Sequence, residues 1–188
     1  MASSSLDRRG VAAGGAAGVA AWLLGYVFTY LLVAPDVRES GLNRVIEALQ
    51  GEPATVDVVG WVFYNAHLVE TVVADVPVLG TSSTSFIGGD GGFSSLLYVI
   101  PVALLLAAGL AAGRYQGARA TSDGILAGLA VLPGYLVASV VGAFLFVVSV
   151  GGATVSPDPV LAVLVAGIAY PVLFAGAGGA LAGLTTGD

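Results

Sequence analysis

Four long stretches of this chain are almost free of charge, and each is long enough to cross a lipid bilayer as a helix. They cover residues 11–33, 93–113, 124–150 and 159–184. A helix needs about 20 apolar residues to span the hydrocarbon core of a bilayer. Backbone groups in lipid find no hydrogen-bond partner outside their own segment, so such stretches must be helical. The sequence therefore predicts an all-α fold, a single membrane domain built as a four-helix transmembrane bundle.

The composition excludes several kinds of chemistry. The 188-residue chain has no Cys and a single His, His67. Disulfides, thiol catalysis, Cys-ligated metals and a site of several histidines from one chain are therefore ruled out. The predicted spans contain no Asp, Glu, Lys, Arg or His, whereas proton pumps and ion-coupled transporters need such groups at depth. They also contain no base and nucleophile pair, and we expect no enzyme activity, no cofactor and no metal site.

The basic residues indicate the orientation of the predicted bundle. All six are Arg, against twelve carboxylates. Arg8 and Arg9 precede the first span, and Arg114 and Arg119 lie between the second and the third. Positive residues gather on the cytoplasmic side of a membrane protein. We therefore expect a multi-pass protein of the cell membrane with cytoplasmic N- and C-termini and an external insertion at residues 35–92.

The external insertion contains signals for two amphipathic helices. Asp36 and Glu39 have the spacing of a capping box, and an apolar stripe follows it toward a helix end near Gly51, formed by Leu42, Val45, Ile46 and Leu49. A second, more apolar helix is predicted at about residues 55–74, at the outer interface or against the mouth of the bundle. Residues 80–95 are rich in Gly, Ser and Thr, which predicts a flexible linker.

Glycines with four-residue spacing mark one end of every predicted span. Small residues at this spacing allow helix backbones to approach closely, whereas the opposite halves of the spans carry bulky side chains. We predict a packing seam, and a bundle that is tight inside and splayed outside, with the seam formed by Gly10, Gly14, Gly18, Gly109, Gly113, Gly124, Gly128, Gly179 and Gly183.

Two further features of the spans leave alternatives open. Pro133 and Pro171 interrupt the third and fourth spans, which either builds a substrate site at mid-depth or produces kinks that Ser139, Tyr135 or Tyr170 accommodate. Residues 101–113 match residues 171–183 at an offset of 70 (171 − 101). This match is compatible with two duplicated hairpins and also with chance similarity in sequence rich in Ala and Gly.

Four polar residues in the insertion are spaced so that they would share one face of the second helix. They are Tyr64, His67, Glu70 and Thr71. These residues could handle protons or hold a single metal ion, since His67 and Glu70 can converge at this spacing. The alternative is a polar interfacial stripe with one weak helix pair. We favour the stripe, because one His without further ligands rarely holds zinc.

In architecture the chain resembles the small, uncharacterised multi-span membrane proteins of halophilic archaea. The resemblance lies in Arg8-Arg9 before the first span, the acidic insertion, the Gly-rich spans and the absence of Lys. It implies no activity and no functional residues. Our expectation is a non-catalytic scaffold or accessory subunit, and the alternative is a passive channel or small-solute facilitator. The expected partners are the lipid bilayer and either another membrane protein or further copies of this chain, with no nucleic acid.

Overall fold

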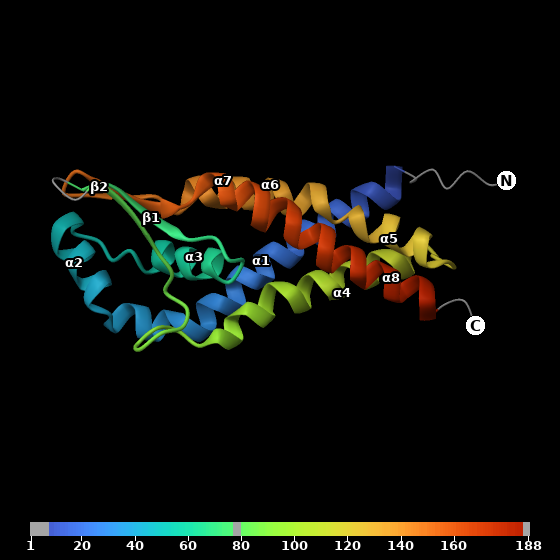
Figure 1. Cartoon of the computed structure of the whole chain (residues 1–188), viewed down its shortest axis with the longest axis horizontal. Helices are drawn as coiled ribbons and strands as arrows, with labels where there is room; N and C mark the ends of the chain where they lie inside the picture. Colours follow the sequence, from blue (N-terminus) through green and yellow to red (C-terminus); the bar gives the residue numbers. More distant parts are fainter. Residues whose placement is uncertain (1–7, 77–79, 186–188) are drawn as a thin grey trace.

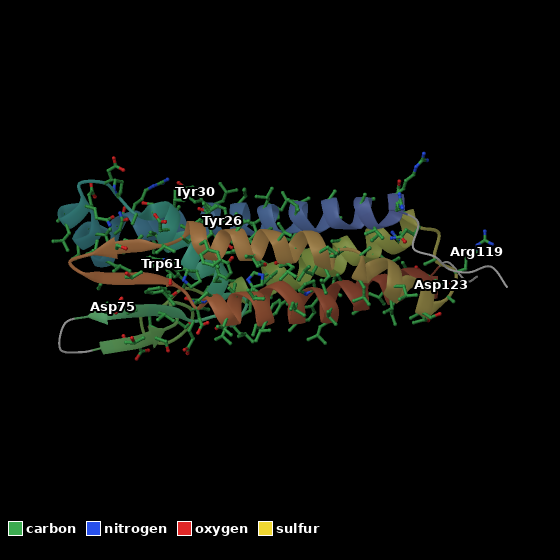
Figure 2. All side chains as sticks on the ribbon, turned by 90° about the horizontal axis from the view of Figure 1, so that it is seen from above. Tyr26, Tyr30, Trp61, Asp75, Arg119 and Asp123 are labelled. Atoms are coloured by element: carbon green, nitrogen blue, oxygen red, sulfur yellow. The ribbon has the colours of Figure 1, made fainter. Side chains whose placement is uncertain are left out.

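The computed structural model describes residues 8–76 and 80–185. Four of its helical segments are long and apolar enough to cross a membrane: Arg8–Glu39, Ser95–Tyr115, Thr121–Leu145 and Pro159–Thr185. They lie side by side, with a small β-sheet and two further helices at one end and the described chain ends at the other (Figure 1). We call these the sheet end and the terminal end. Asp75 lies at the sheet end, and Arg119 and Asp123 lie at the terminal end (Figure 2).

The four long segments are built differently. The first is one helix, α1 (Arg8–Glu39), and the second joins a 3-10 turn, η1 (Ser95–Tyr98), to α4 (Val99–Tyr115). The third consists of α5 (Thr121–Leu129) and α6 (Leu132–Leu145), and the fourth runs through α7 (Pro159–Leu161), η2 (Ala162–Ala169), η3 (Pro171–Ala175) and α8 (Gly176–Thr185). Both η2 and η3 are π-helical. Pro171 cannot donate the backbone bond that an α-helix requires at that position, and the helix is wound more loosely there.

The sheet was absent from the sequence prediction, so the fold is not all-α. It has four strands in the order β2-β1-β4-β3, each antiparallel to its neighbour. The strands are β1 (Thr71–Val76), β2 (Gly80–Thr84), β3 (Val148–Val150) and β4 (Ala153–Pro157). Residues 148–150 were predicted to end the third span, but its helix stops at Leu145. The β-branched residues that follow pair with β4 instead.

The helix predicted at residues 55–74 is also much shorter than expected. It ends at Asn65 as α3 (Thr55–Asn65), and β1 begins at Thr71. The chain reverses in the turn between them, where Leu68 has a φ of 61° and the Asn65 side-chain amide donates to the Val69 carbonyl at 2.8 Å. The predicted linker at residues 80–95 contains β2 and the start of η1.

The helix α2 (Gly41–Gln50) begins later than the proposed capping box. Because α1 continues to Glu39, Asp36 lies inside a helix and caps nothing. The residue that caps α2 is Ser40, whose side chain accepts from the Asn43 backbone N–H at 3.2 Å. The predicted end near Gly51 is confirmed, since this glycine takes the left-handed conformation with a φ of 83°.

Candidate functional site

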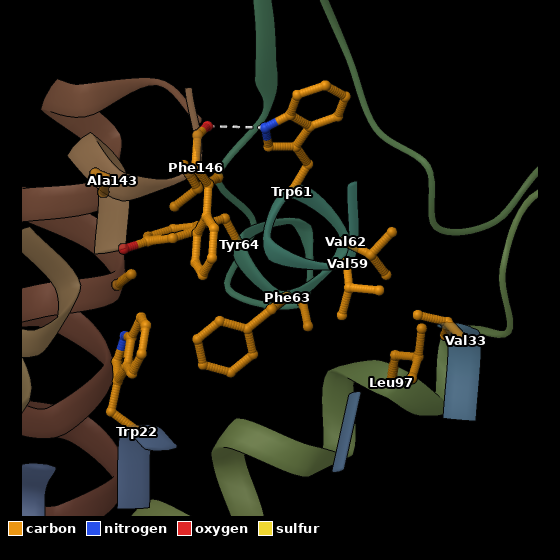
Figure 3. Packing of buried hydrophobic residues seen from close by; sticks show 14 of the residues in the cluster. Trp22, Val33, Val59, Trp61, Val62, Phe63, Tyr64, Leu97, Ala143 and Phe146 are labelled. Atoms are coloured by element: carbon orange, nitrogen blue, oxygen red, sulfur yellow. Dashed lines mark hydrogen bonds between the residues drawn. The ribbon is translucent and has the colours of Figure 1, made fainter. Parts of the chain in front are cut away.

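The helix α3 lies within the mouth of the bundle, not on its surface. Nine of its eleven residues are buried, among them Trp61 and Tyr64. The Trp61 indole N–H donates to the Phe146 carbonyl at 2.9 Å (Figure 3). On another side, the Phe63 ring meets Trp22 edge to face at 5.2 Å between ring centres. The α3 helix therefore fills the space between the sheet-end halves of the long helices.

His67 lies in the turn after α3, and both of its ring nitrogens have partners. Nδ1 is 2.8 Å from the Phe63 carbonyl oxygen, and Nε2 is 2.6 Å from the Tyr135 hydroxyl. A carbonyl can only accept, so Nδ1 carries the hydrogen. In the neutral ring Nε2 is then the acceptor, and Tyr135 donates its O–H to it. The contacts thus fix the tautomer of this His.

The surroundings of His67 keep its ring neutral. The side chain is fully buried among the rings of Phe63, Tyr135 and Tyr170. Burial lowers the pKa of His67 to about 4, although the hydrogen bond with the Phe63 carbonyl acts in the opposite direction. A ring that stays uncharged across the physiological pH range is a poor base at pH 7.

Two more tyrosines join α3 and its turn to the long helices. The Tyr64 hydroxyl donates to the Ser139 carbonyl of α6, and burial raises the pKa of Tyr64 above its ordinary value. The Tyr170 hydroxyl donates to the Ala66 carbonyl at 3.3 Å. We use the name aromatic plug for the buried rings that meet here, which are those of Trp22, Phe63, Tyr64, His67, Tyr135, Phe146 and Tyr170.

The structure separates the four polar residues that the sequence had grouped. Tyr64, His67 and Thr71 are buried, and Thr71 accepts from the Asn65 amide at 3.3 Å. Glu70 is exposed on the other side of the turn, where its carboxylate accepts from the Ser83 hydroxyl. The chain turns at Leu68, so the helical spacing of His67 and Glu70 no longer applies. The His67–Glu70 helix pair of the interfacial stripe is therefore wrong, and the hydrogen bonds of these two side chains go to different partners.

The described residues offer little for metal or acid–base chemistry. Within residues 8–76 and 80–185, no group of three or more His, Asp or Glu side chains could hold a metal ion. Both nitrogens of His67 are already engaged in internal hydrogen bonds. Two buried groups at the plug are unpartnered in the described part of the chain, namely the indole Nε1 of Trp22 and the hydroxyl oxygen of Ser139. The arrangement suits a closed structural junction.

The glycines of the predicted seam lie at helix contacts. A Cβ added at Gly124 would collide with the carbonyl of Gly179, and one at Gly179 would collide with that of Gly124. A Cβ added at Gly109 or at Gly128 would likewise collide with the Ala175 carbonyl. A Cβ added at Gly183 would collide with the Ala120 carbonyl, and one added at Gly18 would collide with the Val131 carbonyl. An added Cβ would lie 2.5 Å from Ala130 Cβ at Gly14, 2.6 Å from Ala182 Cβ at Gly113, and 2.9 Å from the Gln116 side chain at Gly10.

Sequence reasoning missed the partners of α3. From the sequence, Tyr135, Tyr170 and Ser139 were expected to accommodate proline kinks, and no contact with α3 was predicted. In the structure, Tyr135 and Tyr170 bond to residues 68 and 104 positions away, on the other side of the plug. The available signal was that these are isolated polar residues in otherwise apolar spans. A buried hydroxyl needs a partner, and the polar residues at the end of α3 could have been matched to them.

Comparison with known families gives one match and no functional information. The profile of DUF7978, described as a family of unknown function, matches residues 1–186. The match covers nearly the whole chain, so the protein belongs to this family. No curated protein and no solved structure matches the chain.

Proposed function

We propose that this member of the DUF7978 family is an integral membrane protein with a non-catalytic role, as a scaffold or accessory subunit of a membrane assembly. Its long helices would span the bilayer, with the terminal end in the cytoplasm and the sheet end outside. The observation that carries the proposal is the aromatic plug, which fills the bundle with side chains whose polar atoms are largely satisfied internally.

The outward faces of the long helices support a place in lipid. They carry large apolar side chains that the fold leaves exposed, including Leu23, Leu24, Leu31, Leu32, Val137, Val141, Leu164 and Leu173. A soluble monomer rarely exposes a continuous apolar surface of this extent. In a bilayer the same surface contacts lipid tails and carries no penalty.

The distribution of charge supports the orientation. Arg8, Arg9, Arg114 and Arg119 belong to the terminal end, where Asp123 is the described carboxylate. At the sheet end, carboxylates outnumber the two arginines, Arg38 and Arg44. The carboxylates are those of Asp36, Glu39, Glu47, Glu52, Asp57, Glu70, Asp75, Asp90 and Asp158. The positive-inside rule assigns the end richer in arginine to the cytoplasm.

The plug favours a subunit over the alternative, a passive channel or small-solute facilitator. A path through the plug would have to displace several of the largest fully buried side chains in the described chain, among them Phe63, Tyr64, His67 and Tyr135. Tyr64 and Tyr135 are also held by hydrogen bonds. A facilitator would need these groups to move apart in every transport event.

The two roles can be separated by experiment. The purified chain is reconstituted in liposomes, and efflux of potassium and of small neutral solutes is compared with that from protein-free liposomes. In parallel, the chain is extracted gently from its native membrane, and co-purifying proteins are identified by mass spectrometry. The proposal expects background efflux and a stoichiometric partner. Efflux that exceeds background and falls when the protein-to-lipid ratio is reduced would refute the subunit role and favour the passive channel or facilitator.

A further inference from the structure

A small apolar groove lies between α1 and α4 near the terminal end. Its volume is about 190 Å³, and its walls are Ala13, Gly14 and Ala17 from α1 with Ala111, Ala112 and Tyr115 from α4. Binding sites for drug-sized molecules usually measure about 300–1,000 Å³. The groove is therefore too small for such a ligand, but its volume and apolar walls suit a segment of one lipid tail.

Gln116 provides a polar group at the terminal end of this groove. Its side chain reaches from the end of α4 toward α1, because a Cβ added at Gly10 would lie 2.9 Å from Gln116 Cδ. Gln116 also lines the groove, and its Nε2 is buried without a hydrogen-bond partner in the described chain. An unpaired buried donor is costly, and a ligand oxygen at this point would satisfy it.

Two arginines lie beside the groove walls at the terminal end. Arg9 stands four residues before Ala13 and eight before Ala17, so these three residues follow one side of α1. On the other wall, Arg114 lies in the last turn of α4, three residues after Ala111 and therefore beside it on the helix surface. Both guanidinium-bearing residues are exposed. The groove is therefore apolar along its walls and positively charged at its terminal end, and a phospholipid has the same arrangement, with an apolar tail and a phosphate headgroup at one end.

From this arrangement we infer that the groove binds one anionic phospholipid. A tail lies along the small residues of α1 and α4, an oxygen of the glycerol region accepts from Gln116 Nε2, and the phosphate lies between Arg9 and Arg114. Guanidinium groups bind phosphate with charge-assisted hydrogen bonds. Tyr115, with 69% of its surface exposed, lies at the depth where aromatic rings meet lipid headgroups. The inference rests on the proposed membrane location, but not on the role as a subunit.

Native mass spectrometry of the full chain provides the test. The protein is released from mixed micelles that contain equal amounts of phosphatidylglycerol and phosphatidylcholine, and the lipid that remains bound is identified. We expect one phosphatidylglycerol per chain. The double variant Arg9→Gln, Arg114→Gln should bind it roughly 25-fold more weakly, at about fivefold for each arginine removed, as expected for a basic residue near an anionic lipid surface.

Three controls make the result specific. Arg44→Gln removes a charge at the sheet end and should leave retention unchanged. Ala13→Leu fills the groove and should reduce retention without a change in charge, whereas Ala16→Leu places the same bulk on an exposed part of α1 and should not. Excess inorganic phosphate should not displace the lipid. Equal retention of both lipids, or a double variant that behaves as wild type, would overturn the inference, while a chain that does not purify with membranes would instead refute the proposed location.

Discussion

The contact between α5 and α8 offers a controlled test of close helix packing, because two of the four buried glycines of α8, Gly176 and Gly179, have different surroundings. A Cβ added at Gly179 would collide with the Gly124 carbonyl oxygen and lie 2.9 Å from the Gly128 nitrogen, both of which are backbone atoms. A Cβ added at Gly176 would meet only Leu129 Cδ2 at 3.8 Å, an ordinary van der Waals contact. Gly179→Ala and Gly176→Ala are therefore the same chemical change in one helix, with and without overlap.

The size of the expected difference follows from two effects. Replacement of Gly by Ala inside a helix gains about 1 kcal/mol of helix propensity, and this gain is common to both variants. Overpacking in a tight contact costs about 1–3 kcal/mol, and it applies only to Gly179→Ala. We expect Gly176→Ala to be neutral or stabilising and Gly179→Ala to be less stable than Gly176→Ala by about 1–3 kcal/mol.

The measurement is the free energy of unfolding in mixed micelles, obtained by titration with sodium dodecyl sulfate. The fluorescence of the two tryptophans, Trp22 and Trp61, reports unfolding because both are buried in the folded chain. Equal stability of the two variants would mean that α5 and α8 do not approach as closely as the structure has them. The glycine seam would then reflect composition and not helix packing.

Three further predictions concern the plug and the orientation. The free energy of unfolding should fall by about 3 kcal/mol as the pH falls from 6.5 to 4, because the His67 ring binds a proton near pH 6.5 in the unfolded chain and only near pH 4 in the folded one. The variant His67→Gln should lack this loss. Superimposable pH profiles of the wild type and of His67→Gln would contradict the prediction. Tyr135→Phe should cost about 1–3 kcal/mol in the same titration, since it leaves Nε2 of His67 buried without a donor, whereas the exposed Tyr115→Phe should change stability little; equal effects would refute the assigned bond. In a chain without native Cys, Ser82→Cys should react with an impermeant maleimide on intact cells and Ala120→Cys only after lysis, and the reverse pattern would invert the proposed orientation.

The long helices could be predicted from sequence because a span is a local property of length and apolarity. Where they end could not. The apolar run of the third span continues through residues 146–150 with Ser149 as the one polar residue, and periodicity alone does not separate a buried strand from the end of a buried helix. The decisive interaction is the pairing of Val148 with Val155 across a turn at Gly151 and Gly152, and of β4 with β1. The pairing between β1 and β4 joins residues that are at least 80 positions apart, such as Ala74 and Thr154, and it leaves no local pattern.

The candidate site was only half visible for a related reason. The polar residues Tyr64, His67 and Thr71 stood out by type, but helical spacing placed Glu70 beside them. The turn at Leu68 breaks that spacing, and its left-handed φ of 61° is uncommon for a residue other than Gly, Asn or Asp. The apolarity of α3 was correctly recognised as unsuited to water, yet its burial depends on how far the sheet-end halves of α1 and α6 stand apart.

Backbone hydrogen bonding explains why polar residues gather at this point of an apolar bundle. The last turn of any helix leaves carbonyl groups without backbone donors, and here that turn is buried where water is not at hand to satisfy them. His67 Nδ1 donates to the Phe63 carbonyl and Tyr170 donates to the Ala66 carbonyl, while the Asn65 amide donates to the Val69 carbonyl in the turn that follows α3. Tyr135 in turn satisfies the nitrogen of His67 that remains. The polar side chains of the plug therefore complete the end of a buried helix, a structural use of His and Tyr that leaves neither free for catalysis and agrees with the non-catalytic role that we propose.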